Sequence, residues 1–269
     1  MDSGFYAAVN GARRMNMRLD VLSNNLANVN TNGFKEGHIN FDSYLTSAGP
    51  EQHPLPTDTF MGLRGPGDIP FPYSNPASNA YQMTYPMATG TEDNLAQGSM
   101  RMTGNMYDVA VEGKGFMVVN TPQGRRYTRD GSFSVNQIGE LVTKDGYQVV
   151  GQGGATLVVG SGKVSIGKDG TISGADGQIG QLALVSLPKE SLKKEGQNFY
   201  SAPQAQEQVV GIDEGRFSQG FIEGSNANTI RNMTQMIETQ RAFEVYMKML
   251  QALDGLDGQA AGSIGKLNG

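Results

Sequence analysis

The sequence predicts an α+β protein in which N- and C-terminal α-helices form a coiled-coil-like domain around a mainly β central domain. Apolar residues recur with heptad spacing at both ends, and short alternating runs punctuated by Asp-Gly pairs fill the middle. A Pro-rich stretch separates the first helix from the β region. We expect a terminal-helix domain at 1–32 and 224–269, an extended Pro/Gly-rich connecting segment at 33–99, and a β-rich outer domain at 100–223.

The N-terminal helix is predicted from apolar residues that repeat every seven positions. One row holds Phe5, Ala12, Leu19 and Leu26, and a second row, three positions later, holds Ala8, Met15 and Leu22. Two such rows make one apolar seam on a helix. The helix should stop by 28–32, where Gly33 suits a turn with positive φ and Phe34 would anchor the next segment.

The C-terminal helix is predicted from about 227 to 253, with an N-cap in Gly224–Asn226. Its apolar stripe comprises Met236, Phe243 and Leu250, seven positions apart, widened by Met233, Ile237, Tyr246, Met247 and Leu253. The Asp-Gly pairs at 254–255 and 257–258 should weaken this helix and leave 258–269 as a frayed tail.

The middle of the chain is predicted to consist of short strands. Tyr107–Glu112 alternates, and Gly115–Val119 follows across a glycine turn. Asp-Gly pairs at 130–131, 145–146, 169–170 and 176–177 separate the further candidate strands Ser132–Val135, Tyr147–Val150, Thr156–Val159 and Leu182–Leu187. The similar units Thr128–Gly131 and Thr143–Gly146 predict two successive hairpins.

Residues 46–99 carry eight of the eleven prolines, with tyrosines between them. A stretch of this length without secondary structure is unusual inside a compact domain. It is either a linker or an inter-subunit strap that orders only against neighbours. Because prolines remove backbone donors, we do not expect a central strand here.

Composition excludes most chemistry. The chain has no Cys, and His38 and His53 lack partners at metal-ligand spacing, so no metal or cofactor is expected. No grouping of acid, base and nucleophile suggests an enzyme. The net charge of −5 argues against nucleic acid, and no apolar run is long enough for membrane insertion. The N-terminus also lacks the basic start and apolar region of a cleaved signal peptide.

The two amphipathic ends allow two interpretations. The helices can pack on each other within one domain, or they can join other copies of the chain. The second is favoured because a two-helix core is small, and its apolar burial barely offsets the entropy of ordering some fifty residues.

Several blocks of residues resemble a known family. Ser23–Lys35, reading SNNLANVNTNGFK, resembles the N-terminal signature of the bacterial flagellar basal-body rod and hook family. Gly220–Asn228 and Met236–Phe243 look like its C-terminal signature. Asp108–Phe116 and Tyr127–Phe133 resemble its middle domain. These matches are long and span nearly the whole chain.

The resemblance implies a structural subunit that polymerises through its terminal helices into the hollow axial shaft that transmits torque. It implies copies of itself and other flagellar axial proteins as partners. It also implies export by the flagellar type III apparatus, without a cleaved signal peptide, to the periplasmic rod. Within the family, residues 1–6 and 243–249 look most like the proximal-rod protein, whereas 236–242 fits the distal-rod protein equally well.

The heptad rows and the resemblance together place an assembly interface on the two ends. Its candidate residues are Phe5, Ala12, Leu19, Leu22, Leu26, Asn25, Asn28, Gly33, Phe34, Met236, Ile237, Phe243, Met247 and Leu250. Asn25 and Asn28 can bond backbone groups at the helix end or a neighbouring subunit. A secreted glycan-binding β-domain is the alternative from another class, and it predicts an exposed aromatic cluster in the β region.

Overall fold

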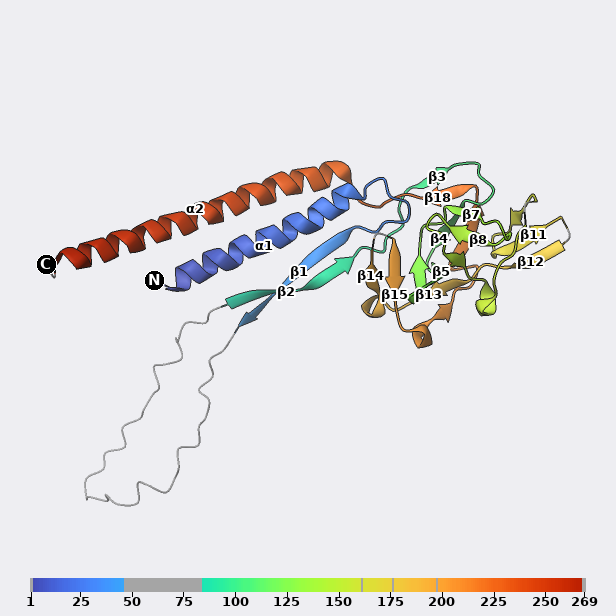
Figure 1. The fold of residues 1–269 in the computed structure, drawn as a ribbon, viewed down its shortest axis with the longest axis horizontal. Helices are drawn as coiled ribbons and strands as arrows, with labels where there is room; N and C mark the ends of the chain where they lie inside the picture. The colour runs from blue at the N-terminus through green and yellow to red at the C-terminus, as the bar shows by residue number, and fades with distance from the viewer. Residues whose placement is uncertain (1, 46–83, 161, 176, 197, 268–269) are drawn as a thin grey trace, which may run out of the picture.

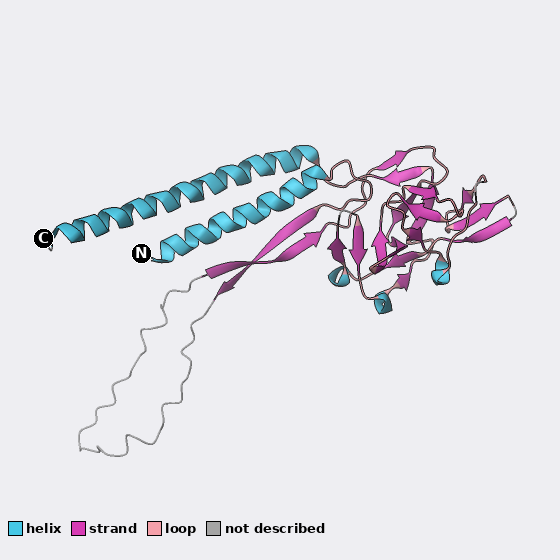
Figure 2. Ribbon diagram, in the orientation of Figure 1, coloured by secondary structure: helices cyan, strands magenta, loops and turns pink. Residues whose placement is uncertain are grey.

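The computed structural model describes residues 2–45, 84–160, 162–175, 177–196 and 198–267. A long helix pair, formed by α1 (Asp2–Ala27) and α2 (Thr229–Leu267), extends from one end of a β-rich region (Figures 1 and 2). The two helices run antiparallel, so that both chain ends lie far from the β region (Figure 1). The prediction of an α+β protein with a helix at each end and a mainly β centre is confirmed.

Helix α1 ends where the sequence predicts. Its last residue is Ala27, and Gly33 adopts the expected positive φ of +68°. A side chain at Gly33 would also collide with the backbone of Arg129, because a Cβ there would lie 2.5 Å from the Arg129 carbonyl carbon. Gly33 is therefore required both by the turn and by the close approach of the β region.

Helix α2 begins slightly later and ends much later than predicted. Its first turn is capped by Asn228, whose side-chain oxygen accepts a hydrogen bond from the backbone N–H of Arg231 at 3.0 Å. The helix runs through Gly255 and Gly258 to Leu267. A glycine costs only about 1 kcal/mol inside a helix, and neither of these two takes the left-handed conformation that would end it.

A two-stranded antiparallel ribbon follows α1. It pairs β1 (Gly37–Leu45) with β2 (Thr84–Asp93), from Gly37 opposite Asp93 to Leu45 opposite Thr84, with a shift of register between Asn40 and Phe41. Part of the expected connecting segment is thus a strand. Pro86 is tolerated because both strands of a two-stranded sheet are edges. The rest of the strap or linker prediction, residues 46–83, lies outside the described residues.

The β-rich region beyond the ribbon is called the β body here. Its strands are β3 (Met100–Met102), β4 (Val109–Gly113), β5 (Phe116–Thr121), β6 (Gly124–Thr128), β7 (Phe133–Val135), β8 (Leu141–Thr143), β9 (Gln148–Val149), β10 (Ser165–Ile166), β11 (Thr171–Gly174), β12 (Gly177–Gln181), β13 (Leu184–Ser186), β14 (Lys193–Glu195), β15 (Phe199–Ser201), β16 (Gln208–Val209), β17 (Gly215–Gln219) and β18 (Phe221–Glu223). Short 3-10 turns are η2 (Gln152–Gly154), η3 (Lys189–Ser191) and η4 (Gln204–Gln206).

The largest sheet of the β body has the strand order β14-β15-β6-β5-β9-β8-β7, and β13 also pairs with β5. Smaller antiparallel units are β10-β11-β12, β17-β4 and β18-β3. The last two pairs join residues about a hundred positions apart, and they return the chain from the β body to the start of α2.

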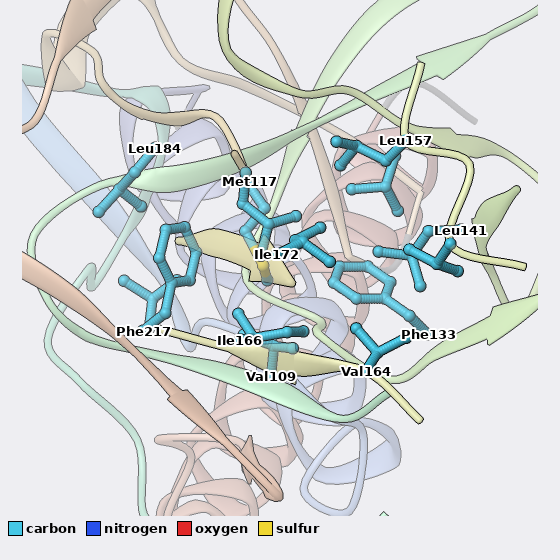
Figure 3. Close-up of a cluster of buried hydrophobic side chains, with 14 of the residues drawn as sticks. Val109, Met117, Phe133, Leu141, Leu157, Val164, Ile166, Ile172, Leu184 and Phe217 are labelled. Atoms are coloured by element: carbon cyan, nitrogen blue, oxygen red, sulfur yellow. The ribbon is translucent and has the colours of Figure 1, made fainter. Parts of the chain in front are cut away.

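Strand β5 lies at the centre of the packing, as its apolar sequence suggests. Met117 and Val119 face one cluster of buried side chains, shown in Figure 3, whereas Phe116 and Val118 face a second cluster. This alternation follows from the two-residue period of a strand. Both faces of β5 are therefore covered, so the β body has its own buried core.

Most of the predicted Asp-Gly turns are confirmed. Gly146 has a φ of +83° between β8 and β9, and Gly170 has a φ of +85° between β10 and β11. The hairpin predicted at Thr128–Gly131 is wrong, because β6 and β7 do not pair with each other. Gly131 is needed instead because the carbonyl of Val109 leaves no room for a side chain there. The predicted strand Thr156–Val159 forms only isolated bridges.

Candidate assembly interface and its junction

The inner face of the helix pair is sparsely apolar. On α1 the buried apolar side chains are Ala8, Ala12 and Leu22, two of them only methyl groups. Tyr246 of α2 fills the space over Gly11 of α1, where a Cβ would lie 2.6 Å from the tyrosine Cζ. This small-to-large contact sets the antiparallel register of the two helices.

The outer face of the helix pair is unusually apolar. Phe5, Tyr6 and Val9 are exposed on α1, and Ile230, Met233, Ile237, Val245, Met247, Met249 and Leu256 are exposed on α2. Ile230 is 78% exposed and Ile237 is 54% exposed. Exposed charged residues such as Arg241, Glu244 and Lys248 lie among them. Large apolar side chains gathered in this number on two exposed helices are nevertheless typical of an interaction site.

Helix α2 is also longer than its partner. It has 39 residues against 26 in α1, which corresponds to an overhang of about 20 Å at 1.5 Å per residue. Figure 1 shows α2 continuing past the N-terminus with no described segment of the chain beside it. Among the described residues, the last turns of α2 therefore have no helix to pack against.

The structure separates the predicted interface residues into three groups. Phe5, Ile237 and Met247 are exposed, and Leu19, Leu26, Met236, Phe243 and Leu250 are half-buried in the helix pair. Ala12, Leu22, Asn25, Asn28, Gly33 and Phe34 are buried by this chain itself. The exposed group is the one available to another subunit, and for it the interface stays a prediction.

The predicted asparagines act inside the chain. The Asn25 side chain bonds both backbone groups of Gly37, donating to its C=O and accepting from its N–H at 2.9 Å each. Asn25 thereby fastens the start of β1 to the last turn of α1. The Asn28 amide donates to the Asn24 carbonyl at 2.9 Å and closes the helix end.

A buried ion-pair triad lies where the helix pair meets the β body. Lys35 Nζ is 2.5 Å from Glu223 Oε1, and Arg129 NH1 is 3.1 Å from Glu223 Oε2. The three residues are 1%, 4% and 0% exposed for Lys35, Arg129 and Glu223 respectively. We call this set the junction triad. Buried charges are costly unless they are paired, so its geometry is closely constrained.

Backbone groups add hydrogen bonds to the junction triad, although the buried Arg129 Nε has none among the described residues. Lys35 Nζ donates to the Ala96 carbonyl at 2.8 Å, and the Gly98 N–H donates to Glu223 Oε1 at 2.8 Å. Arg129 donates to the Gly113 carbonyl at 2.7 Å. The triad therefore links four chain segments that are far apart in the sequence.

A second set of bonds surrounds the triad. The Asn226 side chain accepts from the Glu36 N–H at 2.7 Å and donates to the Asn94 carbonyl at 2.7 Å. Asn232 of α2 donates to Glu36 Oε1 at 3.0 Å. Both helices are thus tied to the segment that follows α1.

The predicted anchor Phe34 is 1% exposed and lies under a cation. The ammonium of Lys194 is 4.0 Å from the centre of its ring, and it donates to the Lys35 carbonyl at 2.8 Å. Such a cation–π contact is strongest when it is withdrawn from water. Phe34 is therefore held by the β body of its own chain.

Burial governs the electrostatics of the junction triad. It lowers the pKa of Lys35, and the nearby Glu223 carboxylate partly opposes this by favouring the charged ammonium. Burial lowers the pKa of Arg129 in the same way, again opposed by Glu223. The same carboxylate therefore compensates the burial of both cations.

The sequence did not single out the members of the junction triad as a site. Each lies inside a block that resembles the rod and hook family: Lys35 ends the first block, Arg129 lies in the middle one, and Glu223 lies in the last. The one signal in the sequence was a charged residue within a motif made mostly of small and polar residues. No local pattern indicated that Lys35, Arg129 and Glu223 lie together in the fold.

Other surfaces of the described residues offer little chemistry. A cavity of about 550 Å³ is lined by β13, the Gly151–Gly154 turn and the Gln204–Ile212 segment. Two of its ionic groups are engaged with each other, since Glu207 accepts from the Tyr127 hydroxyl at 2.6 Å and pairs with Arg125 at 3.2 Å. The described residues contain no cluster of His, Asp and Glu able to hold a metal ion.

The glycan-binding alternative predicts exposed aromatic side chains on the β body. Among its described residues, Phe116, Tyr127, Phe133, Tyr200 and Phe217 are buried, and the remaining aromatic residues are half-buried. The expected stacking platform is not found in this part of the chain. In the described part of the chain, neither helix has the length and apolar character needed to cross a bilayer.

A β body that carries a helix pair with an uncovered apolar side defines a structural subunit built for assembly. Three family models match the chain: "Flagella basal body rod protein" at residues 5–35, "Flagellar hook protein FlgE/F/G D1 domain" at 110–174, and "Flagellar basal body rod FlgEFG protein C-terminal" at 218–262. The chain belongs to the flagellar basal-body rod protein family.

Similar proteins cover almost the whole chain. The flagellar basal-body rod protein FlgF of Caulobacter vibrioides is 32% identical over 276 residues, covering 100% of both chains. The rod protein FlgG of Buchnera aphidicola subsp. Schizaphis graminum is 34% identical and covers 90% of this chain and 92% of its own. FlgG of Bacillus subtilis is 30% identical, with 93% and 94% covered. This chain is therefore a structural subunit of the flagellar rod, which assembles with other axial proteins.

Proposed function

We propose that this rod subunit polymerises through its terminal helices, whose outer apolar faces pack in coiled-coil-like contacts against neighbouring copies and line a hollow shaft that transmits torque. The observation that carries the proposal is the imbalance of the helix pair. On α1 the fully buried apolar side chains are two alanines and one leucine, whereas larger apolar side chains such as Phe5 and Ile237 stay in water. Packing against other copies would bury them, at about 25 cal/mol per Å² of apolar surface.

The domain boundaries proposed from the sequence fit this role. Residues 1–32 with 224–269 would form the inner, channel-lining domain, 33–99 the connection, and 100–223 the outer β domain. The junction triad and the bonds of Asn226 lie where these three parts meet. Residues 46–83 are proposed to act as a strap between subunits.

The proposed location is the periplasmic part of the rod, reached through the flagellar type III export apparatus without a cleaved signal peptide. The absence of Cys suits a chain that is threaded unfolded, because no disulfide has to be broken. The proximal rod is the proposed position, on the resemblance of residues 1–6 and 243–249, with the distal rod as the alternative. Electron microscopy of basal bodies that carry a tagged chain decides between the two positions.

The interface proposal is tested by maleimide labelling, which the Cys-free chain makes site-specific. We expect Ile237→Cys to label readily in the monomer and to be protected in isolated basal bodies. The control is Lys144→Cys, in the exposed turn between β8 and β9, which should label in both states. Equal labelling of Ile237→Cys in monomer and basal body would refute the proposal.

A further inference from the structure

We propose that the junction triad of Lys35, Arg129 and Glu223 is the orientation lock of this subunit, which fixes the angle at which the helix pair leaves the β body. The inference rests on the proposed polymerisation, because an assembled subunit must present its helices and its β body in a set relation. It goes further by naming the groups that hold that relation.

Beyond the junction, the helix pair has few contacts with the β body. Helix α1 packs mainly on α2 and on the bases of β1 and β2, and both helices run away from the β body (Figure 1). Helix α2 is about 58 Å long at 1.5 Å per residue, so a rotation of about 10° at its base would move its far end by about 10 Å. A small error at the junction therefore becomes large at the assembly surface.

Contacts of the triad come from both sides of the junction. Lys35 lies in the segment between α1 and β1, whereas Arg129 belongs to the β body and Glu223 ends β18 shortly before α2. The Glu223 backbone also takes part, since its carbonyl accepts from the Gly33 N–H at 2.8 Å. One residue thus holds the exit of α1, the approach to α2 and the β body together.

The chemistry of the triad suits orientation better than apolar packing would. Apolar contacts are non-directional, so two apolar surfaces can slide over each other at little cost. A buried charge that loses its partner is strongly destabilised, and the carboxylate of Glu223 has both oxygens engaged by cations. A rotation that separates Lys35 from Glu223 is therefore resisted steeply.

The placement of the triad in the family blocks points the same way. Lys35 lies within the first matched segment, 5–35, Arg129 within 110–174, and Glu223 within 218–262. The triad joins one residue from each segment at distances of 2.5 Å and 3.1 Å. It is thus the point at which the three segments are held in one arrangement.

The test follows the orientation of the helix pair in the monomer through a distance between α1 and the β body. Spin labels are placed at Asn16→Cys on α1 and Lys144→Cys on the β body, both exposed, in the chain that has no other Cys. Pulsed dipolar spectroscopy gives the distribution of distances between them. The key variant is Lys35→Met, which removes the tether on the α1 side and leaves Arg129 and Glu223 as a neutral pair.

We expect Lys35→Met to widen the distance distribution at least twofold while the thermal midpoint of the β body stays within a few degrees of wild type. The matched control is Glu195→Gln, which breaks the surface pair between Glu195 and Arg126, at 2.6 Å, and should change neither quantity. A narrow distribution in Lys35→Met would overturn the lock.

A second variant keeps the proposal testable if single substitutions unfold the junction. The triple change Lys35→Met, Arg129→Met and Glu223→Leu removes every charge of the triad, a replacement that proteins often tolerate. A widened distribution in this variant supports the lock, and a narrow one refutes it. Because both measurements use the monomer, their outcome is independent of the labelling test of polymerisation.

Discussion

Replacing Gly33 by alanine should destabilise this protein far more than the same change at a glycine with almost identical backbone geometry. Gly33 has a φ of +68° and Gly104 has a φ of +73°, so alanine meets the same left-handed strain at both positions, about 1 kcal/mol. They differ in their surroundings. A Cβ at Gly104 would meet no atom within 4 Å, whereas one at Gly33 would lie 2.5 Å from the carbonyl carbon of Arg129.

The extra cost at Gly33 follows from that contact. Ordinary van der Waals contact begins at 3.4 Å, so the backbone at 33 and the turn at Arg129 must separate by about 1 Å. This movement breaks the 2.8 Å hydrogen bond from the Gly33 N–H to the Glu223 carbonyl. Leaving these buried groups unpaired costs about 1–3 kcal/mol each. We therefore expect about 3–7 kcal/mol for Gly33→Ala against about 1 kcal/mol for Gly104→Ala.

Urea unfolding followed by circular dichroism measures both values, provided that the two variants and the wild type share one m-value. Limited proteolysis supplies a second measure, because opening of the junction should expose residues 28–36 before the β body unfolds. Free energies of unfolding that agree within about 0.5 kcal/mol for the two variants would show that the close approach at Gly33 carries no energy, and the reasoning would fail.

Three further predictions follow from other parts of the structure. Ile237→Asp should change the free energy of unfolding of the monomer by less than about 0.5 kcal/mol, because the side chain is exposed, yet it should abolish motility in a swimming assay. Gly11→Ala should lower the thermal midpoint by collision with Tyr246, and Tyr246→Leu in the same chain should restore it, as calorimetry would show. Burial, together with Glu207, raises the pKa of Tyr127 above its ordinary value of 10.0. As the pH rises, Tyr127 therefore loses its proton in the unfolded state before it does so in the folded state. The contribution of Tyr127 to the free energy of unfolding is complete below pH 10, and it falls above pH 10 by up to about 1.4 kcal/mol per pH unit. Tyr127→Phe should reduce that slope in unfolding curves recorded between about pH 10 and 11.5.

Local patterns in the sequence predicted those parts of the fold that depend on local physics. The heptad rows gave both helices, and the Asp-Gly pairs gave turns such as the one at Gly146. The predictions were wrong where a contact with a residue far away in the sequence determines the local structure. The Asp-Gly pair at 130–131 resembles a hairpin turn in the sequence. In the structure, glycine is needed at 131 because the Val109 carbonyl leaves no room for a side chain. Gly255 looks like a helix stop, but a glycine only weakens a helix unless it adopts the left-handed cap.

The junction triad could not be predicted from local patterns for the same reason. Lys35 and Glu223 are 188 positions apart, and no periodicity connects them. Charged residues are almost never fully buried unless paired, so each of the three reads as a surface residue when taken alone. Family resemblance located the blocks that contain them, but only the folded chain shows that the blocks meet.

The width of the apolar stripe on α2 is the remaining argument for assembly. A helix that packs on one partner needs an apolar stripe a little over 100° wide. On α2 the half-buried row of Met236, Phe243 and Leu250 already faces α1, yet Ile237 and Met247 continue the apolar surface around the helix. The sequence predicted one broad apolar stripe on α2. In the structure these residues are divided between the face toward α1 and the face away from it. Among the described residues α1 is the helix that packs on α2, and Ile237 and Met247 stay exposed beside that contact. Burial of this outer face by another subunit is the proposal made above, and the protection of Ile237→Cys in basal bodies tests it.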